Sequence, residues 1–218
     1  MEESTSREKV LKKVRNALIS KTENPFPSLD LESPVFSASE DSTDVTFAQE
    51  FSKVSGKFVY CEDQDDLKSN LIQLIREFKW QNIYCLDPEL QDILKEAAIP
   101  FLTTEEEFTQ TAVGFTKCEF LIARTGSIMI SSRQVSGRRL NVFPEIHVIV
   151  AGTSQIVADL KDALKKLQEK YNGNLPSLIS VITGPSRTAD IEKTLVMGAH
   201  GPKQLYLFLI DEGELYAK

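Results

Sequence analysis

The residues of this chain best suited to chemistry lie in two short loops toward its C-terminal end. The first loop has the sequence Gly184-Pro185-Ser186-Arg187-Thr188, and the second reads Ala199-His200-Gly201-Pro202. Together they supply two hydroxyl groups, a guanidinium and one of only two histidines. Such groups bind small organic acids and phosphates, because arginine offers forked donors and hydroxyl groups add neutral ones. We therefore expect a ligand or partner site at these loops.

Two apolar runs flank the loops, at residues 178–182 and 205–210, and both have the length and composition of buried strands. Between them Thr188 is suited to cap a helix. The pattern predicts a βαβ unit with a parallel strand pair, whose first loop would lie at a carboxyl strand end, where open α/β sheets bind ligands. In the alternative interpretation, glycine and proline only make turns, while Arg187 and His200 hold the loops together.

Three further groups of polar residues follow strand-like runs and are candidates for the same site. They are Thr125-Gly126-Ser127, Arg138-Arg139, and Glu145 with His147. If these groups converge with the two C-terminal loops, they form a site for a small anion. If they do not, the arginines are ordinary solvated loop residues.

Catalysis by this chain would depend on a small number of residues. Glu145 is the main candidate for a nucleophilic carboxylate, Glu119 is a second, and His200 is a candidate base. A metal site made of Glu145, His147 and His200 would have suitable ligand types but no diagnostic spacing, so no metal is predicted. The sequence contains no glycine-rich nucleotide-binding motif, so no nucleotide cofactor is predicted either.

The composition of the 218-residue chain fits a globular protein, with 41% apolar and 26% charged residues. Its formal net charge of −7 argues against nucleic acid and anionic membranes as partners. No apolar stretch approaches the length of a membrane span. The three cysteines, Cys61, Cys85 and Cys118, lack the close spacing of an iron–sulfur site and favour a reduced cytoplasm, so we expect no cofactor.

The chain divides into an N-terminal segment at residues 1–45 and an α/β domain at 46–218. Residues 6–20 predict an amphipathic helix with a basic face, followed by a connector rich in proline and serine at 22–44. We expect this helix to dock on the domain or on another subunit, with a membrane surface as the alternative.

Within the domain, strands and helices alternate as in a parallel sheet with flanking helices. The expected helices are 46–54, 65–78, 88–97 and 154–171, and the further strands are 57–61, 82–86 and 142–150. Residues 106–150 depart from this alternation. Two apolar runs there, 120–123 and 128–131, are too close for a crossover helix, so we expect antiparallel pairing or a bent strand in a mixed β insertion.

Several of these motifs together resemble the LutC/YkgG family, whose shared unit is called the LUD (lactate utilisation) domain. The resemblance covers nearly the whole chain. The motifs that carry it are Gly-Pro-Ser-Arg-Thr-Ala-Asp-Ile-Glu from Gly184, Gly-Ala-His-Gly-Pro from Gly198, Ala-Arg-Thr-Gly-Ser from Ala123, and Arg138-Arg139-Leu140 leading into Pro144-Glu145-Ile146-His147. Family members often have an acidic residue where this chain has Arg124.

The resemblance implies a NagB/RpiA/CoA transferase-like fold and a role as a non-redox component of L-lactate oxidation beside iron–sulfur partner proteins. The alternative is a free-standing CoA-transferase-like or sugar-phosphate-isomerase-like enzyme using Glu145 or His200. Whether the chain is an enzyme is left open. The candidate ligand-binding residues are Thr125, Gly126, Ser127, Arg138, Gly184, Ser186, Arg187, Thr188 and His200.

Overall fold

The computed structural model describes residues 5–19, 25–28, 30, 36, 41–104, 106, 108–191, 194–198 and 200–213. The chain forms two units, Met1–Ala38 and Ser39–Lys218. The first unit contains α1 (Ser6–Ile19), which confirms the predicted N-terminal helix. Most of the predicted connector at 22–44 lies outside the described residues.

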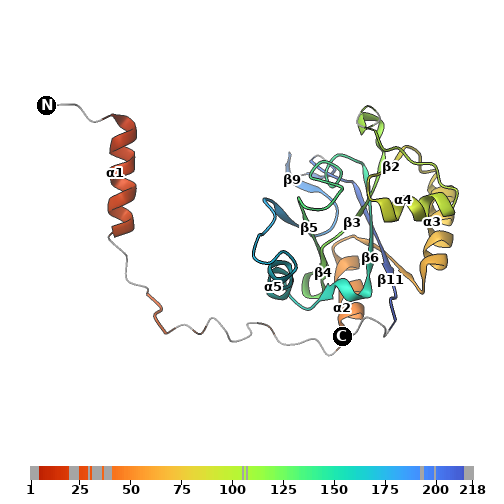
Figure 1. Ribbon diagram of the computed structural model, residues 1–218, viewed down its shortest axis with the longest axis horizontal. Helices are drawn as coiled ribbons and strands as arrows, with labels where there is room; N and C mark the ends of the chain where they lie inside the picture. Colours follow the sequence, from red (N-terminus) through yellow and green to blue (C-terminus); the bar gives the residue numbers. More distant parts are fainter. Residues whose placement is uncertain are drawn as a thin grey trace. The chain divides into compact units, whose positions relative to one another are not determined.

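The second unit is built on a five-stranded sheet in which every neighbouring pair of strands is parallel (Figure 1). Its order is β1 (Lys57–Cys61), β11 (Gln204–Ile210), β6 (Ile146–Gly152), β3 (Val113–Lys117) and β2 (Ile83–Cys85). One face is covered by α3 (Gln64–Phe78) and α4 (Pro88–Glu96), whose leucines join its core. The mostly parallel α/β fold with flanking helices is thus confirmed.

The other face of this sheet packs against a second, four-stranded sheet. Its order is β7 (Ile156–Val157), β4 (Phe120–Ile122), β5 (Ser127–Ser131) and β8 (Ile179–Ile182). The pair β4–β5 is antiparallel, as predicted. α2 (Thr43–Lys53) places Phe47 and Phe51 in the core between the sheets, and α5 (Leu160–Lys170) covers the outer face of the second sheet.

Local signals explain where the helices begin. The aspartates Asp63, Asp87 and Asp159 cap α3, α4 and α5, accepting hydrogen bonds from backbone amides of the first turn. Helix α5 begins at Leu160, six residues later than predicted, because 153–155 form a short turn and Ile156–Val157 pair with β4.

The region 106–150 was predicted as an insertion, but part of it belongs to the parallel sheet. β3 and β6 belong to the parallel sheet, and only β4 and β5 join the second one. Strand β3 was not predicted, because Gly114, Thr116 and Lys117 interrupt its apolar pattern.

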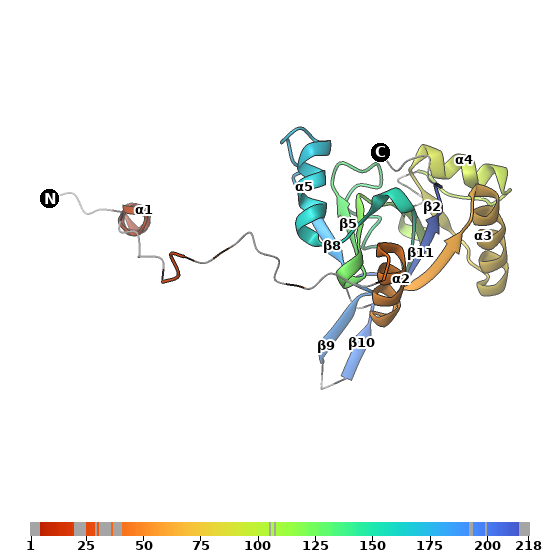
Figure 2. The same cartoon turned by 90° about the horizontal axis from the view of Figure 1, so that it is seen from below.

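The predicted βαβ unit is wrong. In place of a helix after Thr188, the chain forms an antiparallel hairpin of β9 (Arg187–Ile191) and β10 (Thr194–Met197), which extends away from the body of the unit (Figure 2). The flanking strands β8 and β11 lie in different sheets. The segment is rich in β-branched residues and too short for a strong helical pattern, so its preference for strands prevails.

Candidate functional site

The loop Gly184–Thr188 packs against the C-terminal end of α2. Gly184 has a φ of 73°, and a Cβ atom there would overlap the carbonyl oxygen of Val54. The Nη2 atom of Arg187 donates to the same carbonyl oxygen and to the Ser55 hydroxyl at 3.1 Å. Because the last carbonyls of a helix have no partner within it, Arg187 serves here as a helix cap. Thr188 lies in β9, where it begins no helix.

The turn Thr125-Gly126-Ser127 packs against the same helix. Gly126 has a φ of 56°, and a Cβ atom there would overlap the backbone of Phe51 in α2. The buried Ser127 hydroxyl donates to the Thr125 hydroxyl at 2.8 Å and lies 2.8 Å from that of Thr183. Two of the predicted groups therefore meet, but they meet through packing contacts around α2.

Arg124, the residue that departs from the family pattern, forms a two-pronged ion pair with Asp159. Its Nε and Nη2 atoms lie 2.8 and 3.0 Å from the two carboxylate oxygens. The hydrogen bond from Arg124 lowers the pKa of Asp159, which also caps α5. The positive charge of Arg124 is thus paired with the carboxylate of Asp159.

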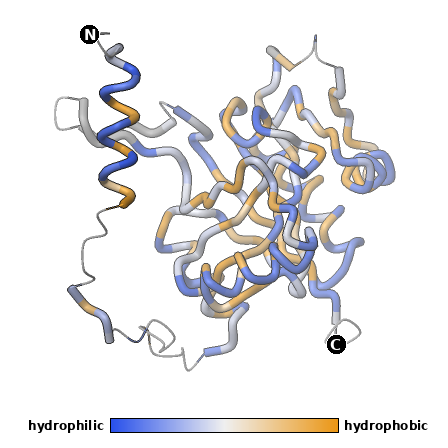
Figure 3. The backbone as a smooth tube through the Cα atoms, turned by 60° about the vertical axis from the view of Figure 1, so that its left-hand side comes forward, coloured by the Kyte–Doolittle hydropathy of each residue, from blue (hydrophilic) through white to orange (hydrophobic). Residues whose placement is uncertain are grey.

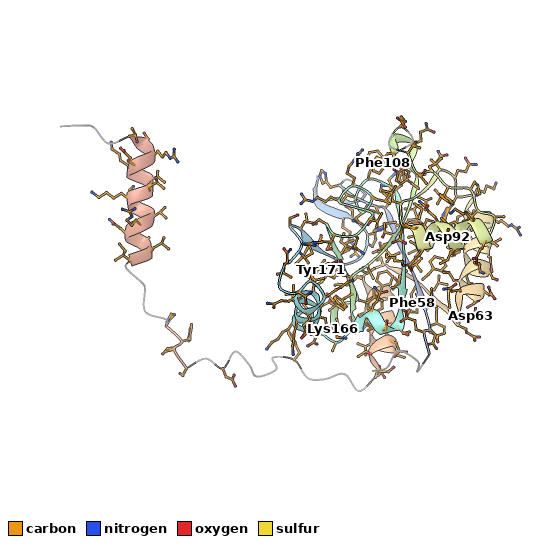
Figure 4. The ribbon with its side chains drawn as sticks, in the orientation of Figure 1. Phe58, Asp63, Asp92, Phe108, Lys166 and Tyr171 are labelled. Carbon is orange, nitrogen blue, oxygen red and sulfur yellow. The ribbon has the colours of Figure 1, made fainter. Side chains whose placement is uncertain are left out.

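Arg138 and Arg139 were expected to join the Gly184–Thr188 loop, but Arg138 contacts Ser177 and Arg139 contacts Phe108. The Arg138 Nη2 atom donates to the Ser177 hydroxyl at 2.8 Å. The Arg139 guanidinium lies 4.1 Å from the ring centre of Phe108, which Figure 4 labels. These contacts fix the loop before β6 to its neighbours.

His200 and Glu145 do come together, in a shallow depression of about 550 Å³ at the amino ends of β6 and β11. The Glu145 carboxylate pairs with Lys203 at 2.8 Å, and the Lys203 amide donates to the Glu145 carbonyl oxygen at 2.8 Å. Val142 and Phe143 line the same depression with 53% and 51% of their surface exposed. We call the set 142–145, 198, 200, 201 and 203 the amino-end surface.

Backbone hydrogen bonds connect this surface to the first loop. The Ser186 amide donates to the Pro202 carbonyl oxygen at 2.9 Å, and the Gly198 amide donates to the Ser186 carbonyl oxygen at 2.9 Å. Gly201 lies against Ser186, where a Cβ atom would be 3.2 Å from the serine Cβ. The two sequence motifs therefore form one structural unit, with His200 at its exposed side.

The remaining histidine, His147, does not join Glu145 and His200. It is fully buried on β6, with Nε2 2.8 Å from the Thr116 hydroxyl, and burial lowers its pKa to about 3. Among the described residues there is no cluster of three or more acidic, histidine or cysteine side chains able to hold a metal ion. His147 is a neutral core residue.

Glu119, the second candidate nucleophile, is a buried and fully hydrogen-bonded carboxylate. Its oxygens accept from Ser131 at 2.6 Å, from Tyr171 at 2.8 Å and from Lys170 at 2.7 Å. Burial alone raises the pKa of Glu119, but the bonds from Lys170, Ser131 and Tyr171 outweigh it and hold the pKa below its ordinary value. This carboxylate holds the second sheet to α5.

A second depression, of about 570 Å³, lies at the carboxyl ends of the parallel strands and was not predicted from the sequence. It is lined by residues at or just after the carboxyl ends of β1, β3, β6 and β11 and by residues of α4, and Figure 4 labels two of the lining residues, Asp63 and Asp92. The Glu212 carboxylate lies against Gly152 there and accepts from the Ser154 amide at 3.0 Å. A search for polar residues within two positions after the predicted strands 57–61 and 205–210 would have found Asp63 and Asp211.

Together these features define a two-sheet α/β protein with surface depressions at both ends of its parallel strands. The model of the LUD domain matches residues 83–210, more than half of the chain. The chain therefore belongs to the LUD domain family.

Curated relatives agree with this assignment. The chain is 36% identical over 124 residues to the uncharacterized protein NMB1437 of Neisseria meningitidis, covering 57% of this chain and 52% of that protein. It is 32% identical over 102 residues to Lactate utilization protein C 1 of Bacillus mycoides, covering 46% and 44%. It is 35% identical over 105 residues to the uncharacterized protein YkgG of Escherichia coli, covering 47% and 46%. The matches thus span about half the length of these relatives.

A solved structure supports the fold. The crystal structure of a DUF162 family protein from Deinococcus radiodurans has a TM-score of 0.56 and 16% sequence identity, covering 77% of this chain and 96% of that one. In the described part of this chain, no helix is long and apolar enough to cross a membrane.

Proposed function

We propose that this protein is a non-redox component of an L-lactate oxidation system and acts beside iron–sulfur partner proteins. Support comes from its relatives named Lactate utilization protein C and from its LUD domain. Within such a system, the component would bind a partner through the amino-end surface.

The state of the cysteines supports a role without an iron–sulfur cluster. Burial raises the pKa of Cys61 to about 11 and those of Cys85 and Cys118 to about 12. An iron–sulfur cluster is usually held by four cysteines at short spacings, whereas this sequence has three cysteines far apart. Electron carriers would therefore belong to partner chains.

The observation that carries the binding role is the composition of the amino-end surface. Two large apolar side chains, Val142 and Phe143, are half exposed there beside His200 and the Glu145–Lys203 pair. Exposed apolar residues with a polar rim are typical of sites that bind other proteins. A catalytic carboxylate instead needs a desolvated pocket that adjusts its pKa, whereas Glu145 is exposed and paired with a lysine. The geometry thus favours partner binding over the free-standing enzyme.

The test is reconstitution with purified iron–sulfur proteins of a lactate-utilising system, with lactate-dependent dye reduction as the readout. We expect activity to depend on this chain and to fall with Val142→Ser. The matched control is Val181→Ser, which changes an exposed valine of β8 in the second sheet and should retain activity. Equal dye reduction with and without the chain would refute the proposal.

A further inference from the structure

Two neighbouring segments of the second unit contain no acidic residue. They are residues 120–144 and 170–189, and the pairing of β5 with β8 brings them together. The chain as a whole has 32 acidic residues among 218 and a formal net charge of −7. The same two segments carry several cations, so they form a local region of positive charge on an acidic protein.

Three of these cations already have roles within the fold. Arg124 pairs with Asp159 at 2.8 Å, and Lys170 pairs with the buried Glu119 at 2.7 Å. Arg187 caps α2. The charges of these three residues are therefore accounted for without a ligand.

Arg133 and Arg138 are different. Both are exposed and, in the part of the chain that the structure describes, neither forms an ion pair with a carboxylate. The Arg133 Nη2 atom donates to the Asn174 carbonyl oxygen at 3.3 Å, and its guanidinium carbon lies 5.3 Å from the ring centre of Tyr171, which Figure 4 labels. The Arg138 Nη2 atom donates to the Ser177 hydroxyl at 2.8 Å. Two positive charges are thus held beside neutral groups.

These contacts place the two guanidiniums close together and accessible from solution. Both are anchored to the segment 174–177, which spans at most about 11 Å when fully extended. Each bond uses one nitrogen, so the other N–H groups of each guanidinium can reach a ligand. Figure 3 shows hydrophobic segments gathered inside the second unit and hydrophilic ones mostly around them, which fits a polar site at its outside.

Serine hydroxyl groups lie beside both arginines. The Ser132 hydroxyl is next to Arg133 in sequence and lies 3.2 Å from the Ser177 hydroxyl, which accepts from Arg138. The Ser136 hydroxyl, in the loop that joins the two arginines, is buried and has no hydrogen-bond partner. The site therefore combines two forked cations with neutral donors.

The number of donors indicates which anion this site suits. A single guanidinium fork already engages both oxygens of a carboxylate. A phosphate group has a further oxygen and carries close to two negative charges at neutral pH, so it can bridge two guanidiniums and still accept from a hydroxyl group.

We propose that Arg133 and Arg138, with Ser132 and Ser177, bind a phosphate group, carried by a small phosphorylated metabolite or by a phosphorylated side chain of a protein. None of these residues belongs to the amino-end surface. The inference goes beyond the proposed function and does not depend on it.

The experiment is a ³¹P NMR titration of inorganic phosphate with the full-length chain, at low and high salt. We expect Arg133→Gln and Arg138→Gln each to weaken binding at least about tenfold, because charge-assisted bonds are lost. The matched control Arg76→Gln changes an exposed arginine of α3 and should leave binding unchanged. High salt should weaken binding, and lactate should compete at least about tenfold more weakly than phosphate.

A second measurement needs no substitution. Phenylglyoxal modifies exposed guanidiniums, and mass spectrometry locates the product. Phosphate should protect Arg133 and Arg138 in the wild-type chain but leave Arg76 reactive. Competition by a sugar phosphate and by a phosphoserine peptide then distinguishes the two sources, and the stronger competitor identifies the physiological one.

Three outcomes would overturn the proposal. The first is absence of phosphate binding by the wild-type chain. The second is equal affinity of the wild type and both glutamine variants, with no protection of Arg133 and Arg138, which would place bound phosphate elsewhere. The third is lactate binding as tight as that of phosphate, which would define a carboxylate site instead.

Discussion

The buried histidine predicts a specific pH dependence of stability. His147 is fully buried, and burial lowers its pKa from 6.5 to about 3. Between these two values the unfolded chain binds a proton that the folded chain excludes. The stabilising contribution is therefore present above about pH 6.5 and is lost as the pH falls toward 3.

The size of the effect follows from the two pKa values. Each pH unit between the two pKa values is worth about 1.4 kcal/mol. Lowering the pH from about 7.5 to about 4.5 crosses about two of these units and should remove about 3 kcal/mol through His147 alone. His147→Gln can still bond to Thr116 but does not titrate. Over the same pH interval, the wild type should therefore lose more stability than His147→Gln, and the difference should equal this contribution of His147.

Urea unfolding at a series of pH values measures this difference, with the single tryptophan, the buried Trp80, as fluorescent reporter. Acidic side chains contribute equally to both proteins and cancel in the difference. The matched control is His200→Gln, which makes the same exchange at the exposed histidine. Parallel curves for wild type and His147→Gln would refute the assignment of His147 as a buried neutral group.

Three further substitutions test the internal contacts by urea unfolding. Gly126→Ala should destabilise the protein by at least about 3 kcal/mol because its Cβ would overlap α2. Gly173→Ala is the control, because Gly173 also has a positive φ but open space around it, and it should lower the stability by only about 1 kcal/mol. Equal losses of stability would contradict the contact between Gly126 and α2. Glu119→Gln should lose about 2 to 4 kcal/mol because charge-assisted bonds to a buried carboxylate disappear, and an unchanged urea midpoint would count against them. Arg124→Glu should lose about 1 kcal/mol by opposing Asp159, an effect that high salt should reduce; a loss insensitive to salt would point to packing instead.

Strong periodicity made much of the domain predictable from sequence. Strand β1 and helix α3 were expected within one residue of their bounds, because apolar side chains recur regularly and Gly56 marks the start of the strand. The hairpin β9–β10 was missed because its eleven-residue segment satisfies helix-capping rules as well as strand preferences. The separation of β8 and β11 into different sheets also rules out a βαβ unit, and no local sequence pattern indicates that separation.

The candidate site, too, could be predicted only in part, because local sequence does not show which distant residues come into contact. The residue types in the motifs were correctly identified, and Glu145 does lie in the same depression as His200. Their roles depend on neighbours that are distant in sequence. Arg187 was expected to bind an anion, and its guanidinium is instead committed to α2 through Val54 and Ser55, more than a hundred residues away.

The family motifs contain two groups of residues, one that packs inside the fold and one that is exposed at the surface. Gly126, Gly184 and Arg187 each contact α2, so this part of the motifs holds α2 in place where the two sheets meet. Ser186 then ties that structural part to the loop bearing His200, whose side chain is exposed. A rigid scaffold beneath an exposed loop is how proteins commonly present binding residues, because the surface can vary while the packing beneath it is fixed. We therefore expect specificity for a partner to lie in residues 142–145 and 200–203, and the glycines and Arg187 to determine stability.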